Sequence, residues 1–207
     1  MRRLRLGIPS KGRLAEQATR ILQQAGLSYR RSERSLFARA KELPVELTFL
    51  RTNDIPVLCG EGAIDLGITG SDLVAESNAV VTTRLRLGIG HCRLALCVAE
   101  SAPWQSAAEV VSQRIATTFP RVTREFCARH QGDPHLVPLS GSVEIMIELG
   151  VADAIVDLVE TGSTLAANGL RMLAELGQHE TVVIESPHGV DRDMADRLLR
   201  RIESIVI

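Results

Sequence analysis

A hydrophobic run that ends in acidic and small hydroxyl residues is the most informative feature of the sequence. Ala154–Val159 is typical of a buried strand, Asp157 and Glu160 lie at its end, and the turn 161–164 (TGST) opens a short helix. Backbone N–H groups and hydroxyls in such a turn form a cradle for phosphate. Carboxylates beside that cradle repel the ligand unless they bond sugar hydroxyls or face Mg²⁺. The combination therefore favours a phosphorylated ribose.

The same stretch has a simpler interpretation. Thr161 or Ser163 can act only as the N-cap of a plain helix, with Asp157 in solvent.

Basic residues form a second candidate site near the start of the chain. Lys11, Gly12 and Arg13 follow the strand-like Leu4–Ile8 and precede a helical pattern. This is a position where α/β proteins bind anionic ligands. The alternative is a solvated corner.

Two carboxylates occupy comparable positions elsewhere. Asp72 follows the strand-like 65–69 and a glycine turn, and Glu144 follows the small residues 140–142. Each can face a ligand, or serve only as an N-cap or as a complement to the helix dipole.

These candidates must be positioned by short β-branched runs that alternate with helical patterns, which predicts an α/β fold with mainly parallel sheets covered on both faces. The predicted strands are 4–8, 45–50, 65–69, 80–87, 94–99, 114–117, 135–138, 154–159 and 182–185. The predicted helices are 13–25, 56–61, 107–111, 122–130, 142–149 and 191–205, while 171–176 fits either a helix or an extended segment.

The number of strands favours two lobes over one sheet. We expect a discontinuous domain I, residues 1–92 plus 181–207, and a domain II, residues 93–180, which carries the Asp157 loop. The apolar runs Leu94–Val98 and Thr181–Ile184 are the candidate crossing strands.

Composition excludes several classes of protein. The 207 residues are 45% hydrophobic and 24% charged, which is globular rather than disordered. The 24 basic and 25 acidic residues argue against a non-specific nucleic-acid binder.

No apolar run approaches the ~20 residues of a membrane span and no signal-peptide core is present, so we expect a cytoplasmic protein. The four cysteines form no CxxC pair, which predicts reduced thiols and no zinc.

Seven motifs together resemble the catalytic subunit of the ATP phosphoribosyltransferase family. They are PSKGRL (9–14), RTNDIP (51–56), DLGITGSD (65–72), GHCRLAL (90–96), RIATTFP (114–120), GSVE (141–144) and ADAIVDLVETGSTLAANGL (152–170). The most specific part is Asp157–Leu165, which looks like the family's loop for phosphoribosyl pyrophosphate (PRPP). The resemblance covers nearly the whole chain.

The resemblance implies a two-lobed, periplasmic-binding-protein-like (type II) α/β fold with the active site in the interdomain cleft. It implies transfer of phosphoribosyl from PRPP to N1 of ATP, giving phosphoribosyl-ATP and pyrophosphate, as the first step of histidine biosynthesis. Adenine N1 is a nucleophile without deprotonation, so no Ser–His–Asp or Cys–His device is required.

The resemblance also implies roles for individual residues. PRPP would be bound by Asp157, Glu160, Thr161, Gly162, Ser163 and Thr164. ATP would be bound by Lys11, Gly12, Arg13, Asp72, Arg93 and Glu144. Arg51, Lys11 and Arg34 would be catalytic. Mg²⁺ would be held mainly by substrate oxygens and not by a protein metal site.

A partner is implied as well. The chain ends at Ile207 without the regulatory domain of the family's long form, so it looks like the short form. That form works with a regulatory subunit similar to histidyl-tRNA synthetase, in a hetero-octamer of four chains of each kind.

Two other classes of protein compete with this hypothesis. One is a non-enzymatic, two-lobed anion-binding or sensor domain, because fold alone does not determine function. The missing signal peptide disfavours a periplasmic receptor and the absence of DNA-binding helices disfavours a regulator. The other is a different phosphoribosyltransferase.

Overall fold

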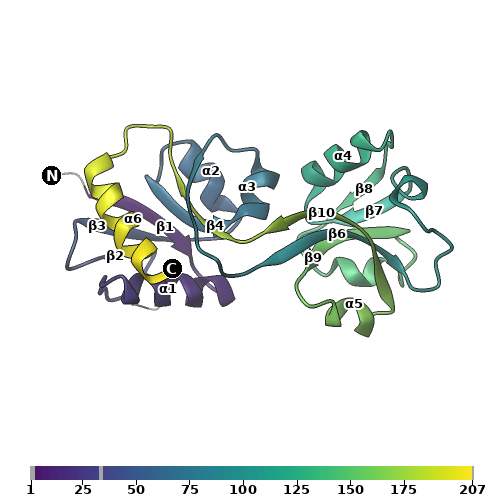
Figure 1. The fold of residues 1–207 in the computed structure, drawn as a ribbon, viewed down its shortest axis with the longest axis horizontal. Coiled ribbons are helices and arrows are strands. Elements are labelled where there is room, and N and C mark those ends of the chain that lie inside the picture. Colours follow the sequence, from purple (N-terminus) through teal and green to yellow (C-terminus); the bar gives the residue numbers. More distant parts are fainter. Residues whose placement is uncertain (1–2, 33–34, 207) are drawn as a thin grey trace. The chain divides into compact units, whose positions relative to one another are not determined.

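The chain folds into two compact α/β units (Figure 1). The computed structural model describes residues 3–32 and 35–206. Unit 1 comprises residues 1–90 and 180–207, and unit 2 comprises residues 91–179. The chain therefore passes from one unit to the other twice, once on each side of unit 2.

Unit 1 is built on a six-stranded mixed sheet with the order β2-β3-β1-β4-β11-β5. Its strands are β1 (Leu4–Pro9), β2 (Phe37–Arg39), β3 (Val45–Leu50), β4 (Leu66–Gly70), β5 (Thr82–Arg86) and β11 (Thr181–Glu185). Its helices are α1 (Arg13–Gln24), α2 (Asp54–Gly60), α3 (Ser71–Ser77) and α6 (Arg192–Val206). Strand β1 pairs in parallel with β3 and β4, and the other pairings are antiparallel.

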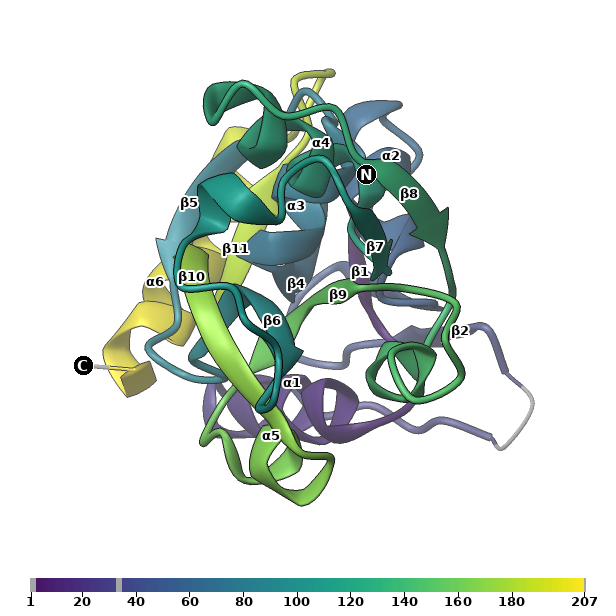
Figure 2. The same cartoon turned by 90° about the vertical axis from the view of Figure 1, so that its right-hand side faces the viewer.

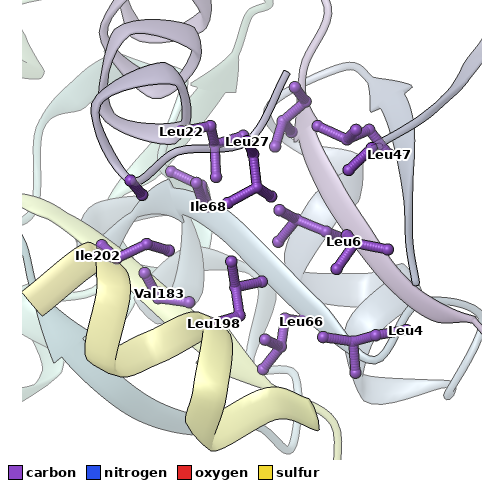
Figure 3. Close-up of a cluster of buried hydrophobic side chains, with 14 of the residues drawn as sticks. Leu4, Leu6, Leu22, Leu27, Leu47, Leu66, Ile68, Val183, Leu198 and Ile202 are labelled. Atoms are coloured by element: carbon purple, nitrogen blue, oxygen red, sulfur yellow. The ribbon is translucent and has the colours of Figure 1, made fainter. Parts of the chain in front are cut away.

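Alternation along the strands supplies both faces of this sheet with apolar side chains. On β11, Val183 belongs to one buried cluster, while Val182 and Ile184 belong to another that includes Ile55 of α2. The first cluster, drawn in Figure 3, joins side chains of α1 and α6 to β1, β3, β4 and β11. Successive strand side chains point to opposite faces, so a nearly continuous apolar run is what a sheet covered on both sides requires.

Gly67 allows α2 to approach β4 closely. A Cβ added at this position would lie 2.5 Å from Ile55 Cγ2, closer than two carbon atoms can pack. The glycine therefore fixes the distance at which α2 covers the sheet.

Unit 2 contains a five-stranded mixed sheet with the order β10-β6-β9-β7-β8 (Figure 2). Its strands are β6 (Cys92–Ala99), β7 (Arg114–Thr117), β8 (His135–Pro138), β9 (Ala154–Val159) and β10 (Leu170–His179). The helices are α4 (Pro120–Arg129) and α5 (Ser163–Ala167), with 3₁₀ turns η1 (Ala107–Glu109) and η2 (Val143–Met146). Strand β7 is parallel to β8 and β9, whereas β6 is antiparallel to β9 and β10.

Three predictions from the sequence are wrong. The sheets are mixed rather than mainly parallel, since both chain crossings feed antiparallel strands. The expected helices 107–111 and 142–149 are short 3₁₀ turns, and the second of these follows Ser142, whose backbone is left-handed with φ 51°. The strand β2 was not predicted, because three residues with only one buried side chain carry almost no periodic signal.

All four cysteines are free, and Cys59, Cys97 and Cys127 are buried. Among the described residues, none of the helices combines the length and the apolar character needed to cross a bilayer.

Candidate active site

The loop that follows β9 is shaped by a glycine and two hydroxyls. Gly162 has φ 79°, a left-handed conformation that favours glycine, and it is the N-cap of α5. Thr161 Oγ1 and Ser163 Oγ lie 2.9 Å apart. The N-cap is thus neither Thr161 nor Ser163, and both of these residues and Thr164 are exposed.

This loop borders a cavity of about 350 Å³ within unit 2. Pockets of this size suit small ligands. The lining consists of Glu144 from η2, Ile155 from β9 and the continuous stretch 157–165. The structure therefore brings Glu144 together with Asp157, Glu160 and residues 161–164, although 13 positions separate Glu144 from Asp157 in the sequence.

Asp157 is the electrostatically unusual group of the cavity. Burial raises the pKa of its carboxyl above the ordinary value, and the negative charge of Glu144 acts in the same direction. The hydrogen bond from the Leu158 N–H to Asp157 Oδ1, at 2.8 Å, opposes the shift. A carboxylate held this way gains from a ligand that donates hydroxyl hydrogens or brings a cation.

The cavity has no lysine or arginine among its described lining residues. An anion there would be held by backbone N–H groups and hydroxyls. Arg93 lies near this region on β6, where it pairs with Val159 of β9, next to Glu160. Its side chain is half-buried.

The β1–α1 turn of unit 1 places Lys11, Gly12 and Arg13 together. The Ser10 N–H donates to Leu50 O at 2.7 Å, and Gly12, with φ 83°, is the N-cap of α1. Lys11 and Arg13 are exposed. A second cavity, of about 460 Å³, is lined by Lys11, Gly12, part of α1 and Arg31.

Sequence reasoning did not single out Arg31 from the arginines around it. Its guanidinium lies 3.9 Å from the centre of the Phe49 ring and donates to Ser10 O at 3.0 Å. These contacts hold a cation beside the Lys11 turn. Nothing in the local sequence distinguishes it from Arg30, because the stacking partner comes from β3.

Arg51 and Asp72 do not line either of these two cavities. Arg51 is exposed at the end of β3, just before α2. Asp72 is 7% exposed in the first turn of α3, whose N-cap is Gly70, so the N-cap interpretation of Asp72 is wrong. Arg34 lies outside the described residues.

The two α/β units define a two-lobed, periplasmic-binding-protein-like fold of type II. A substrate-binding protein of an amino acid ABC transporter is similar at a TM-score of 0.62 over 98% of this chain and 92% of its own, with 14% identity, and this likeness concerns the fold alone.

Residues 51–204 match the family model HisG, ATP phosphoribosyltransferase, and the chain belongs to that family. The ATP phosphoribosyltransferase of Rhodopirellula baltica is 59% identical over 99% of this chain and 68% of its own length. That of Stenotrophomonas maltophilia is 40% identical over 99% of this chain and 71% of its own. The HisG:HisZ complex from Thermotoga maritima contains a chain with a TM-score of 0.86 and 29% identity, covering 98% of each chain.

Membership of this family identifies the activity. The chain is a glycosyltransferase-type enzyme that transfers phosphoribosyl from PRPP to N1 of ATP in the first step of histidine biosynthesis. A non-enzymatic sensor or a different phosphoribosyltransferase is not favoured.

Proposed function

We propose that the cavity of unit 2 is the PRPP subsite of this transferase. The turn 161–164 would bind the 5′-phosphate through backbone N–H groups and hydroxyls, and Asp157 and Glu160 would face the ribose hydroxyls. The observation that carries the proposal is the lining of the cavity, which combines the left-handed Gly162 turn with the desolvated carboxyl of Asp157. A phosphorylated sugar satisfies both halves of this lining.

The reaction calls for charge stabilisation rather than a base. The bond from ribose C1 to the pyrophosphate oxygen breaks, and its electron pair leaves with pyrophosphate. The lone pair of adenine N1 forms the new bond to C1, with no prior proton removal. Positive charge develops on the sugar and negative charge on the leaving group, so preorganised carboxylates and cations lower the barrier.

Cations and carboxylates outside the turn would serve ATP and the departing pyrophosphate. Lys11, Arg51 and Arg34 would stabilise developing negative charge, Arg through bidentate contacts. Lys11, Gly12, Arg13, Asp72, Arg93 and Glu144 would bind ATP. The exposure of Lys11, Arg13 and Arg51 supports these roles, since each can reach a large anionic ligand.

Mg²⁺ would enter as part of the substrate. Among residues 3–32 and 35–206, no group of three or more His, Cys, Asp and Glu could hold a metal ion. Asp157 and Glu160 nevertheless fit a cation carried by PRPP, because burial disfavours the charged form of Asp157 and a cation would restore it. When bound, Mg²⁺ neutralises charge on the pyrophosphate, and most of its ligands would be substrate oxygens and water.

A regulatory subunit similar to histidyl-tRNA synthetase would complete the enzyme, in a hetero-octamer with four chains of each kind, in the cytoplasm. The similarity to the chain from the HisG:HisZ complex, over 98% of both chains, supports this assembly.

One assay tests the activity and the partner together. The chain is mixed with ATP, PRPP and Mg²⁺, with and without the partner, and a new adenine absorbance is followed. Turnover is expected when the partner is present. Binding of both ligands without turnover under either condition would contradict the proposal and favour a sensor.

A further inference from the structure

A buried hydroxyl lies at the point where the pairing of β7 with β9 ends. It contacts Val156, which lies between Ile155 and Asp157 of the cavity lining. The parallel register between these strands runs from Ile115 and Ala154 to Thr117 and Val156. Thr117 is fully buried, and its Oγ1 donates to Val156 O at 2.9 Å. A side-chain hydrogen bond therefore joins the two strands where their pairing ends.

The acceptor of this bond belongs to the peptide group that joins Val156 to Asp157. The orientation of that peptide plane fixes ψ of Val156 and φ of Asp157, and with them the direction of the Asp157 Cα–Cβ bond. Thr117 itself does not line the cavity. It can therefore influence Asp157 only through the backbone.

The same residue connects β9 to two other segments. Thr117 Oγ1 accepts the Phe119 N–H at 2.9 Å, at the entrance to α4. Thr117 O accepts the Leu139 N–H at 2.9 Å, on the segment that leads from β8 to Glu144. Thr117 is thus hydrogen-bonded to the residue before Asp157 and to the segment that leads to Glu144. Asp157 and Glu144 are the two carboxylates that interact in the cavity.

We infer that Thr117 is a positioning residue for the PRPP subsite, holding the Val156–Asp157 peptide plane so that the Asp157 carboxyl is oriented before PRPP arrives. This inference rests on the proposed binding of PRPP in the unit 2 cavity. Enzymes depend on such preorganisation because small displacements of a binding group are costly in rate.

Thr123 is a matched control. It is also fully buried, and its Oγ1 lies 3.3 Å from Thr117 Oγ1 and donates to Phe119 O at 2.7 Å. It belongs to the same hydroxyl cluster but has no hydrogen bond to β9. Replacing either threonine by valine keeps the shape and removes a buried hydroxyl.

The test compares Thr117→Val, Thr117→Ser and Thr123→Val in the full chain, assayed together with its partner subunit. Thr117→Val is expected to raise KM for PRPP about 10-fold and leave KM for ATP unchanged. Thr117→Ser retains the hydroxyl and restores KM for PRPP. Thr123→Val leaves both constants at wild-type values. Equal effects of Thr117→Val and Thr123→Val on KM for PRPP would overturn the inference.

A reference variant separates this inference from the proposed function. If Thr161→Ala raises KM for PRPP while Thr117→Val does not, the subsite stands and the positioning role fails. If neither variant changes KM for PRPP, the subsite itself is wrong and the inference falls with it.

A measurement on the wild-type chain covers the case in which Thr117→Val does not fold. Hydrogen exchange of the Phe119 amide reports the hydrogen bond to Thr117 Oγ1. PRPP with Mg²⁺ is expected to slow this exchange and to leave the His130 amide, beyond the far end of α4, unchanged. Unchanged exchange at Phe119 would contradict a mechanical link between Thr117 and the subsite.

Discussion

The buried carboxylate of Asp65 lies 2.7 Å from Arg5 Nη2 and connects the start of β4 to β1. Arg5 Nε and the Arg5 backbone N–H also donate to Asp65 Oδ2, and Arg5 Nη2 donates to Gly62 O. Strand β1 leads to the Lys11 turn and β4 leads to Asp72. The pair therefore fixes the relative register of two strands that carry predicted ATP-binding residues.

Removing the arginine is expected to destabilise unit 1. Arg5→Ala removes the guanidinium that bonds the buried Asp65 carboxylate, and the loss in the free energy of unfolding should be about 3 kcal/mol. Urea denaturation measures it. Arg39→Ala removes an exposed pair with Glu46 and should cost less than about 1 kcal/mol. Similar losses for the two variants would show that the buried pair has no special role.

Asp157 in β9 and Asp153, just before β9, should make opposite contributions to the pH dependence of the free energy of unfolding. Burial raises the pKa of Asp157 above 3.8, so its folded form binds a proton more tightly than its unfolded form. Its contribution to stability is complete below pH 3.8 and is lost as the pH rises through the folded pKa. Hydrogen bonds from Arg114 lower the pKa of Asp153, so that contribution is present above pH 3.8 and is lost as the pH falls through the folded pKa.

The aspartate-to-asparagine variants make this testable. Relative to wild type, Asp157→Asn should gain stability as the pH rises from 4 to 7. The stability deficit of Asp153→Asn should stay nearly constant above pH 4 and shrink as the pH falls below 3.8 through the folded pKa of Asp153. Urea unfolding at several pH values measures both. Differences that stay constant with pH would mean that neither carboxyl has a shifted pKa.

The strands that the sequence predicts best are short, apolar and bounded by turns. The strands 114–117 and 154–159 have the predicted limits, because most of their residues are buried in the sheet and are β-branched or apolar. The edge strand 135–138 also has the predicted limits, although none of its residues is buried. Residues 171–176 were ambiguous because leucine, alanine and glutamate favour a helix. Pairing with β6, with two irregularities in register, holds them in β10.

Some residues of the candidate site can be predicted from the sequence, and others cannot. The turn 161–164 is contiguous, so its chemistry is readable along the chain. Glu144 reaches the cavity only through the fold of η2 against β9, and the Arg31 guanidinium is held by a ring from another strand. Contacts of this kind depend on tertiary packing, which no local pattern encodes.

The turn after β9 should affect PRPP specifically. Glu160→Ala and Thr161→Ala are expected to raise KM for PRPP or lower kcat while the fold stays intact, because both side chains are exposed and line the cavity. Steady-state kinetics and thermal unfolding measure the two effects. Ser204→Ala, which removes an exposed hydroxyl on α6, is the control and should leave the kinetics unchanged. Unaltered kinetics in both turn variants would remove the loop from the site.

Arg51 offers the sharpest test of transition-state stabilisation in unit 1. Its side chain is exposed at the end of β3, and no hydrogen bond or ion pair of that side chain occurs among the described residues. Arg51→Ala should therefore leave the free energy of unfolding nearly unchanged and lower kcat by about 100-fold, the usual scale for losing one preorganised donor to a developing anion. Arg39→Ala removes a comparable exposed charge on β2 and should retain full kcat. A decrease of less than about threefold in Arg51→Ala would exclude a direct contact with the departing pyrophosphate.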